Sequence, residues 1–139
     1  MESTVKVLSL KEPWASLIAF GPKRIETRSW RTRYRGPLYI HASAARPSRS
    51  DPLILVLSEV LPGREPACGV ILCRCVLTVC VPMDEEFLSS MTDPTERLCG
   101  EYAPGRFAWL LGDVQVLSEP VPAKGRLGIW TFTLPDSQL

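Results

Sequence analysis

Residues 8–43 decide the fold of this chain, and they read LSLKEPWASLIAFGPKRIETRSWRTRYRGPLYIHAS. The stretch begins as a short strand, and Pro13 suits the first position of a helix, where its missing N–H costs nothing. Gly21 followed by Pro22 is a typical helix stop. Residues 37–43 then alternate between apolar and polar side chains, which predicts a second strand. The stretch is therefore expected to form strand, helix, polar loop and strand in succession.

Polar side chains crowd into the segment that follows the helix stop. Lys23, Glu26 and Arg28 have the spacing Lys-x-x-Glu-x-Arg. A carboxylate can accept hydrogen bonds from nucleobase amino groups, and an arginine can orient that carboxylate or hold a phosphate. The alternative is a surface Glu–Arg pair of little energetic value. If residues 23–30 are extended, Lys23 and Glu26 point to opposite sides, whereas a turn at Lys23 lets both reach one pocket.

Aromatic residues and one histidine add candidates for ligand contacts. Trp30 is the better base-stacking candidate because its neighbours are polar, whereas Trp14 lies on the apolar face of the predicted helix. His41 is the only histidine and shares its strand face with Tyr39 and Ser43. A single histidine on a strand is more often structural than catalytic, but its polar companions keep a ligand-binding role open. The sequence shows no nucleophile triad and no glycine-rich phosphate loop.

The distribution of charge favours an anionic partner. The net charge is +1, yet residues 1–50 hold ten Lys and Arg against three acidic residues. Such asymmetry indicates nucleic acid or another anion near the N-terminal half, and a solvated basic surface is the alternative. The residues that we expect on a nucleic-acid backbone are Arg31, Arg33, Arg35, Lys124 and Arg126.

The five cysteines do not indicate a metal site. Four of them form C-x4-C-x-C-x4-C, but residues 69–81 read as one long strand with an apolar face at the odd-numbered positions from Ile71 onward. At about 3.3 Å per residue, the first and last of the four would lie roughly 40 Å apart. We therefore expect no metal and no cofactor, with Cys73 and Cys75 buried in the core.

The rest of the chain completes a small mixed fold. We expect a helix over residues 51–60, a helical turn over 84–88, a strand or pair of strands over 106–111 and 114–117, and a last strand over 127–134. The 139 residues suit one domain. Non-local strands with two or three short helices predict an α+β fold built on a small mixed β-barrel. No apolar stretch is long enough for a membrane span and no signal peptide is visible, so we expect an intracellular, cytoplasmic protein, with the nucleus not excluded.

Several ordered motifs resemble those of one family. They are LSL at 8–10, PWASL at 13–17, ExRSW at 26–30, YRG at 34–36, IHAS at 40–43, GRFAW at 105–109 and KGRxGxW at 124–130. The chain resembles the ASCH domain (activating signal cointegrator homology), a branch of the PUA-like β-barrels, from Val5 to Leu134. The resemblance implies a single ASCH domain over residues 1–139 with the two basic segments around one cleft.

The resemblance also implies what the cleft does. We expect it to bind RNA, single-stranded nucleic acid or a nucleotide, and the expected ligand-binding residues are Lys11, Lys23, Glu26, Arg28, Trp30, His41 and Ser43. Some ASCH members are hydrolases, either ribonucleases or amidohydrolases that act on N4-acylated cytidine through Lys-x-x-Thr and a later glutamate. In that alternative Lys23 is the catalytic residue, although Glu26 stands at the threonine position and Thr27 is expected to face away. A coactivator-type protein-interaction domain is the third possibility.

Overall fold

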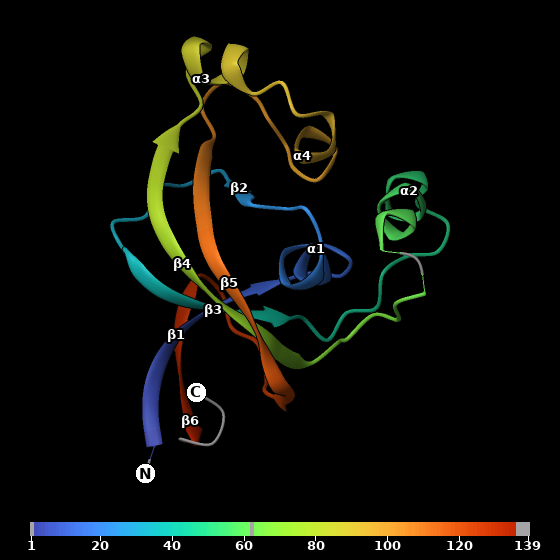
Figure 1. The fold of residues 1–139 in the computed structure, drawn as a ribbon, viewed down its shortest axis with the longest axis vertical. Coiled ribbons are helices and arrows are strands. Elements are labelled where there is room, and N and C mark those ends of the chain that lie inside the picture. Colours follow the sequence, from blue (N-terminus) through green and yellow to red (C-terminus); the bar gives the residue numbers. More distant parts are fainter. Residues whose placement is uncertain (1, 62, 136–139) are drawn as a thin grey trace.

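A six-stranded sheet accompanied by four helices makes up the structure, a computed structural model that describes residues 2–61 and 63–135 (Figure 1). The strands are β1 (Glu2–Leu10), β2 (Ile25–Arg28), β3 (Gly36–Ala42), β4 (Val70–Pro82), β5 (Phe107–Pro122) and β6 (Ile129–Pro135). The helices are α1 (Trp14–Phe20), α2 (Pro52–Val60), α3 (Glu85–Ser90) and α4 (Pro94–Leu98).

The sheet has the strand order β2-β5-β4-β3-β1-β6. β1 runs parallel to β3, and every other ladder is antiparallel. The expected α+β class with a PUA-like architecture is confirmed, but two details of the prediction are wrong. The sheet does not close into a full barrel, because β2 and β6 remain as edges, and the described residues form four helices instead of two or three.

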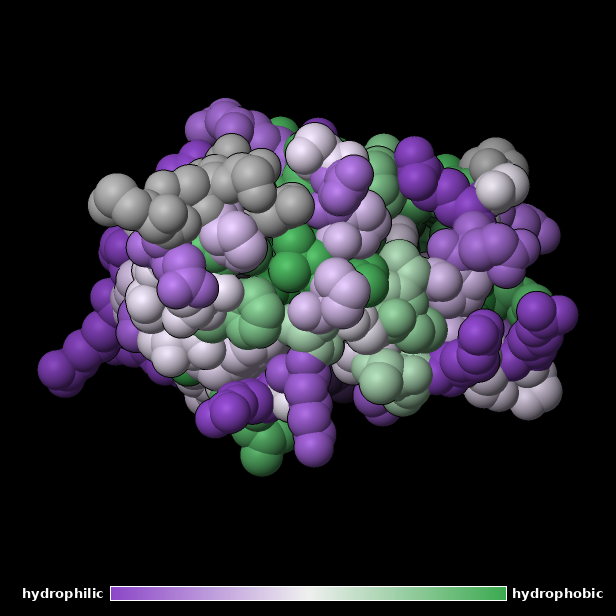
Figure 2. Space-filling view, turned by 90° about the horizontal axis from the view of Figure 1, so that it is seen from below, coloured by the Kyte–Doolittle hydropathy of each residue, from purple (hydrophilic) through white to green (hydrophobic). Residues whose placement is uncertain are grey.

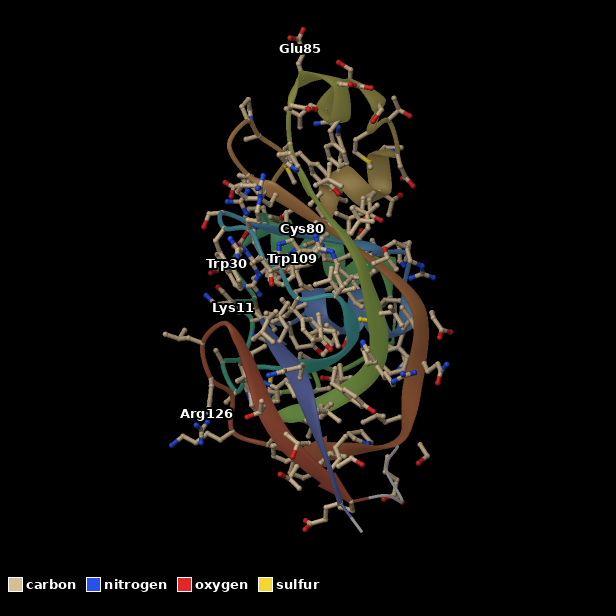
Figure 3. All side chains as sticks on the ribbon, turned by 90° about the vertical axis from the view of Figure 1, so that its left-hand side faces the viewer. Lys11, Trp30, Cys80, Glu85, Trp109 and Arg126 are labelled. Atoms are coloured by element: carbon tan, nitrogen blue, oxygen red, sulfur yellow. The ribbon has the colours of Figure 1, made fainter. Side chains whose placement is uncertain are left out.

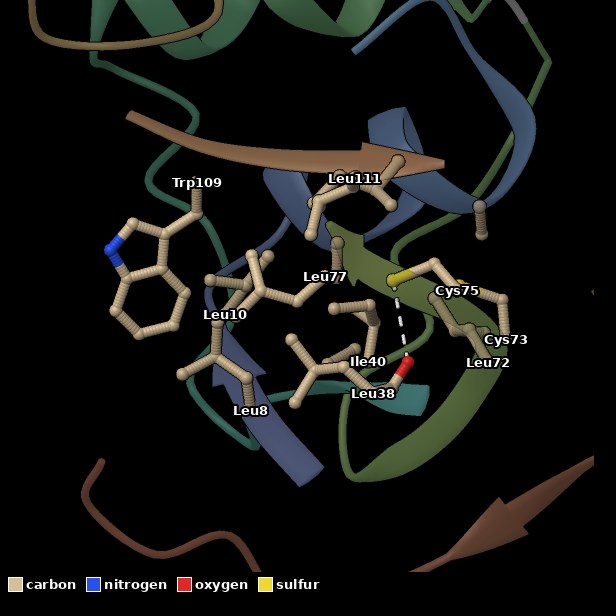
Figure 4. Close-up of a cluster of buried hydrophobic side chains, with 14 residues drawn as sticks. Leu8, Leu10, Leu38, Ile40, Leu72, Cys73, Cys75, Leu77, Trp109 and Leu111 are labelled. Atoms are coloured by element: carbon tan, nitrogen blue, oxygen red, sulfur yellow. Dashed lines mark hydrogen bonds between the residues drawn. The ribbon is translucent and has the colours of Figure 1, made fainter. Parts of the chain in front are cut away.

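The main core lies between the sheet and α1. Leucine, isoleucine and cysteine side chains from β1, β3 and β4 pack there against Trp109 of β5 (Figure 4). Cys73 and Cys75 are fully buried, as expected, and the Cys75 thiol donates to the Leu38 carbonyl oxygen over 3.3 Å. Burial raises the pKa of Cys75 to about 12 and raises that of Cys73 as well. These thiols are therefore inert core groups.

β4 does not keep one continuous apolar face. The pairing of β4 with β5 shifts register between Ile71 and Cys73, and again further along the strand. Ile71 consequently packs in a second cluster with Val7 and Trp130, while Cys73 belongs to the main core. The prediction of an unbroken odd-numbered face is wrong, because each extra residue at a bulge moves the following side chains to the other face.

In Figure 1, α1, α2 and α4 lie beside the sheet, and α3 lies past the end of β4. Figure 1 shows α1 against the middle of the sheet and α2 farther out beyond it. Leu17 of α1, Leu57 of α2 and Cys99 form a small buried cluster that connects these segments. Seen from below, apolar surface lies in the middle of the molecule and strongly hydrophilic side chains project around its rim (Figure 2). None of the helices in the described ranges has the length and apolar character needed to cross a membrane.

Candidate functional site

A cleft of about 620 Å³ opens beside β2, and we call it the β2 cleft. Its walls come from the end of β1, from β2, from the first turns of α1 and α2, and from the segment after α4. The polar lining residues are Ser9, Lys11, Glu26, Thr27, Arg28 and Glu101. The apolar lining comes from Leu10, Trp14, Leu53 and Leu98. The cleft thus combines a charged wall with an aromatic and aliphatic one.

Glu26 is the central acidic group of the charged wall. Its side chain is largely buried, and its Oε2 accepts a hydrogen bond from Arg28 Nε over 2.9 Å. Its Oε1 lies 3.5 Å from Lys23 Nζ. Lys23 and Glu26 therefore meet, as expected if Lys23 lies on a turn, because the main chain becomes a strand only at Ile25.

Lys23 supports the cleft from behind. The residue is only 1% exposed and does not line the cleft. Its ammonium donates hydrogen bonds to the carbonyl oxygens of Ile25 and Cys99, the latter over 3.1 Å, in addition to the ion pair with Glu26. These three partners match the three N–H groups of an ammonium. Lys23 thus connects β2 with the segment that follows α4.

Arg28 reaches the cleft with part of its guanidinium free. Besides the contact to Glu26, its Nη2 donates to the Ser9 carbonyl oxygen over 3.2 Å. The Arg28 side chain is 24% exposed, and Nη1 makes no hydrogen bond to any described residue. A guanidinium has five N–H donors, so Arg28 keeps donors that can bind a ligand.

Two buried glutamates that the sequence analysis did not single out accept hydrogen bonds from backbone N–H groups. Glu96 of α4 accepts hydrogen bonds from the backbone N–H groups of Arg24, at 2.8 Å, and Ile25, at 3.3 Å. Burial raises the pKa of Glu96, although these N–H groups and the Lys23 charge oppose the shift. Glu12 accepts from the N–H and hydroxyl of Ser16 and, at 2.9 Å, from the N–H of Ala67. Glu96 thus anchors the beginning of β2, whereas Glu12 connects α1 with the segment before β4 and lies outside the β2 cleft.

Thr27 also lines the β2 cleft, although we expected it to face away from Glu26. Its Oγ1 accepts a hydrogen bond from the Glu101 N–H over 3.0 Å. Gly100 lies so close that a Cβ on this residue would be 2.8 Å from Thr27 Cγ2. Thr27 therefore fastens the segment after α4 to the end of β2.

The two candidate tryptophans lie in different places. Trp14 is half-buried and lines the β2 cleft. Trp30 is 37% exposed, does not line the cleft, and packs edge-on against Trp109 with ring centroids 4.8 Å apart. Figure 3 shows Trp30 and Lys11 along one edge of the molecule, with Arg126 farther down that edge. Trp30 is thus placed outside the cleft but on the same edge as Lys11.

His41 and Ser43 do not reach the β2 cleft. His41 is fully buried, with Nδ1 2.9 Å from Ser9 Oγ and Nε2 2.8 Å from the Ala123 carbonyl oxygen. Because a carbonyl oxygen only accepts, Nε2 carries the proton and Nδ1 accepts from Ser9. Burial lowers the pKa of His41. The Ser43 hydroxyl is buried and has no hydrogen-bond partner among the described residues.

The expected backbone-binding cations lie on two exposed loops and not in the β2 cleft. Arg31 places its guanidinium 5.3 Å from the centre of the Phe107 ring. Arg35 donates to the carbonyl oxygens of Thr32 and Tyr34. The other exposed members of this set are Arg33, Lys124 and Arg126. Their contact with nucleic acid stays a prediction, as does ligand binding by the residues of the β2 cleft.

Metal-binding side chains do not gather in the described part of the chain. None of the groups formed there contains three or more His, Cys, Asp or Glu side chains placed to hold an ion. All five cysteines are free, and three of them are buried. The strand geometry of β4 keeps Cys73 and Cys75 in the core.

Comparisons with known proteins place the chain in one family. The ASCH domain family matches residues 8–120. Activating signal cointegrator 1 from Homo sapiens is 56% identical over 44 residues, and the protein of that name from Mus musculus is 52% identical over 44 residues. Each match covers 32% of this chain and only 8% of the relative.

A solved structure supports the fold independently of sequence. The crystal structure of a mutant of the ZmASCH protein from Zymomonas mobilis superposes with a TM-score of 0.53. The superposition covers 96% of this chain and 91% of that chain at 18% identity, so it supports the fold alone. The matched residues 8–120 run from the end of β1 through most of β5 and include all four helices. The chain belongs to the ASCH domain family.

Proposed function

We propose that this protein binds single-stranded RNA or a nucleotide in the β2 cleft. The observation that carries the proposal is the Glu26–Arg28 pair on the cleft wall, held in place by Lys23 and by the Ser9 carbonyl oxygen. Such a fixed pair offers hydrogen-bond acceptors and donors side by side. ASCH domains are generally regarded as RNA-interacting modules, and membership of this family supports the proposal.

The lining of the cleft matches the parts of a nucleotide. Glu26 keeps free lone pairs that can accept from the amino or ring N–H groups of a base. Arg28 keeps N–H donors for a base carbonyl or a phosphate. Trp14 and Leu53 offer apolar surface to the face of the base, and Lys11 adds an exposed positive charge.

The surroundings of Lys23 favour binding over catalysis by this residue. A catalytic lysine has to reach the ligand, yet Lys23 is 1% exposed and its ammonium is already held by three partners. Releasing it would take the Lys23 charge away from Glu26 Oε1 and its hydrogen bond away from the Cys99 carbonyl oxygen. The contacts of Lys23 instead suit a positioning residue that orients Glu26.

Two substitutions test the β2 cleft. Glu26→Gln should change the preference among bases more than the overall affinity, because it replaces an acceptor-only group by a donor and acceptor. Arg28→Ala should lower the affinity for every phosphorylated ligand by roughly 1–3 kcal/mol, the value of a lost charge-assisted hydrogen bond. Titration calorimetry with the four nucleoside monophosphates and short RNAs measures both effects.

Matched controls come from exposed positions outside the cleft. Glu59→Gln and Arg49→Ala remove the same types of charge and should leave affinities unchanged. Product analysis of every mixture checks for turnover, and a released base, acid or cleaved strand would favour the hydrolase alternative. If both cleft variants bind as the unmodified protein does and only melt at a lower temperature, Glu26 and Arg28 form a structural ion pair and the proposal fails.

A further inference from the structure

A second cleft of about 430 Å³ lies on a different part of the sheet, and we call it the β4 cleft. Its lining includes Lys6 of β1, Tyr39 of β3, Arg74 of β4 and Gln115 of β5, together with Tyr34 from the loop before β3. No residue lines both this cleft and the β2 cleft. The β4 cleft is thus a separate feature of the molecule.

The pairing of the strands explains why the β4 cleft exists. Tyr39 pairs with Arg74, and Arg74 pairs with Gln115, so three adjacent strands present these side chains on one face. The ladder between β1 and β3 begins only at Val7, and residues 2–6 of β1 pair with β6 alone. The β1–β6 ribbon therefore leaves the rest of the sheet at this point and forms the opposite wall.

Arg74 is the main charged group of the β4 cleft. It is half-buried, forms no ion pair with a carboxylate of the described residues, and donates no hydrogen bond to them. The charge of Arg74 also acts on the Tyr34 hydroxyl. Burial raises the pKa of Tyr34, and the Arg74 guanidinium opposes that shift. A half-buried guanidinium without an anionic partner leaves all its donors available to a ligand.

The other charges around the β4 cleft make it favourable to anions. Lys6 adds an exposed ammonium from β1, and none of the lining residues is acidic. The nearest acidic group in the sequence of β5 is Asp113, which accepts hydrogen bonds from the Gln115 amide at 3.3 and 3.4 Å. Asp113 is exposed and forms no ion pair with Arg74, so it reduces the positive potential of the cleft without cancelling it.

We propose that the β4 cleft binds a phosphate group through Arg74 and Lys6. The planar guanidinium matches two phosphate oxygens, and the ammonium supplies a second positive charge. The Tyr34 and Tyr39 rings and the Gln115 side chain border the site and leave room for the group that carries the phosphate. This proposal does not depend on ligand binding in the β2 cleft.

The phosphate can belong to a mononucleotide or to the backbone of a single strand, and the two sources are distinguished by the ligand used. Titrations with inorganic phosphate and uridine monophosphate test a terminal phosphate. Titration with an eight-residue RNA that ends in hydroxyl groups tests the backbone. Backbone amide shifts in NMR spectra report the place of binding, and the titration curves report the affinity.

We expect phosphate-bearing ligands to shift the amide resonances of Tyr39, Arg74 and Gln115. Arg74→Gln should weaken this binding by about tenfold or more, and Arg74→Lys should weaken it less because it keeps the charge but loses the planar fork. Arg49→Gln, which removes an exposed charge outside both clefts, should leave these shifts unchanged. If Arg74→Gln weakens the binding of the short RNA but not that of inorganic phosphate or uridine monophosphate, the phosphate comes from the backbone of the strand.

If Arg74→Gln does not fold, substitutions at two exposed positions still test the proposal. Lys6→Gln should weaken phosphate binding, whereas Asp113→Asn should strengthen it by removing the nearby negative charge. Unchanged titrations in the Arg74 and Lys6 variants would overturn the proposal. So would acetate producing the same shifts at the same concentration as phosphate, or phosphate shifting only the residues of the β2 cleft.

Discussion

His41 belongs to a buried hydrogen-bond network that joins four segments of this fold. Trp130 Nε1 donates to Ser9 Oγ over 3.0 Å, the Ser9 hydroxyl donates to His41 Nδ1, and His41 Nε2 donates to the Ala123 carbonyl oxygen. The chain of donors connects β6, β1, β3 and the end of β5. A Cβ on Gly125 would lie 2.9 Å from the imidazole, so the loop with Lys124 and Arg126 packs directly on this network.

The lowered pKa of His41 makes stability depend on pH. The folded protein binds the His41 proton more weakly than the unfolded chain, whose histidine titrates near pH 6.5, so acidification below about pH 6.5 favours unfolding. We expect His41→Gln to lower the unfolding free energy at pH 7.5 by about 1–3 kcal/mol, because Ser9 loses its acceptor. The variant should also lose less stability than the unmodified protein between pH 7.5 and 5.5. Urea unfolding at both pH values measures this difference, and equal pH dependence in the two proteins would contradict the assignment of His41 as a buried neutral group.

At the scale of elements, the contact between α4 and β2 determines the shape of the β2 cleft. Glu96 binds the backbone at the beginning of β2, Lys23 binds the Cys99 carbonyl oxygen, and Thr27 binds the Glu101 N–H. The segment from Glu96 to Glu101 therefore follows β2 along its whole length. Close approach of the two backbones is what leaves Glu26 and Arg28 facing the open cleft.

Gly100 permits that approach, and its replacement should disturb it. In Gly100→Ala the new Cβ would clash with Thr27 Cγ2, so we expect a loss of about 1–3 kcal/mol in unfolding free energy and weaker ligand binding in the β2 cleft. Gly112→Ala is the matched control, because the nearest atom to its Cβ, Thr78 Cγ2, is 4.0 Å away. Thermal melts and titrations of both variants check the prediction. If the two alanines have equal effects, the close packing at Gly100 is not what shapes the cleft.

Local signals in the sequence predicted most of the helices and strands. They failed where pairing between distant segments determines the structure. The Asp51-Pro52 signal correctly placed the start of α2, and Asp51 caps that helix through the Leu53 N–H. The same signal at Asp93-Pro94 begins α4, and reading it would have predicted the fourth helix. The strand or pair of strands expected over 106–111 and 114–117 is a single strand, β5, which continues through Asp113 at a φ of 49° because β4 remains paired on both sides of the bulge.

The candidate site was predictable to the extent that it is local. Lys-x-x-Glu-x-Arg placed Glu26 and Arg28 on the wall of one cleft with Lys11. The burial of Lys23 could not be derived in this way, because its partner Cys99 is 76 residues distant in the chain. The role of Glu96 could not be predicted from the local sequence for the same reason. Tyr39 and His41 do share a face of β3, because the extra residue at the irregularity after Ile40 belongs to β4. Both pack beside Trp130 of β6, and this distant strand, which the local pattern does not reveal, buries that face away from the β2 cleft.

At the scale of the whole molecule, basic residues extend well beyond the two clefts. Arg31, Arg33 and Arg35 lie on the exposed loop before β3, and Arg126 lies on the edge that also carries Lys11 and Trp30 (Figure 3). These cations are separate from the hydrogen-bonding groups of the β2 cleft. They suit sequence-independent contacts with a backbone, which depend strongly on salt.

Removing the arginine charges of the loop before β3 should therefore reduce the salt dependence of RNA binding. We expect the triple variant with Arg31, Arg33 and Arg35 changed to Gln to flatten the plot of log affinity against log salt, by about 0.7 for each phosphate that is no longer neutralised. Base preference should not change, since the β2 cleft stays intact. Fluorescence anisotropy with a labelled RNA at several salt concentrations gives the slope. A double change of Arg46 and Arg49 to Gln serves as the control, and an unchanged slope in the triple variant would place the binding surface elsewhere.

The pairing of β1 with β6 has a consequence for the synthesis of the protein. Glu2 to Leu8 pair with Ile129 to Pro135, so β1 leaves the ribosome long before its partner β6. Joining segments so distant in the chain is entropically costly and slow. Until Pro135 has emerged, residues 2–6 of β1 present an open strand edge that other nascent chains can pair with. A stalled ribosome that exposes residues up to about 128 would therefore hold an aggregation-prone chain, and chaperones that shield strand edges should associate with it at that stage.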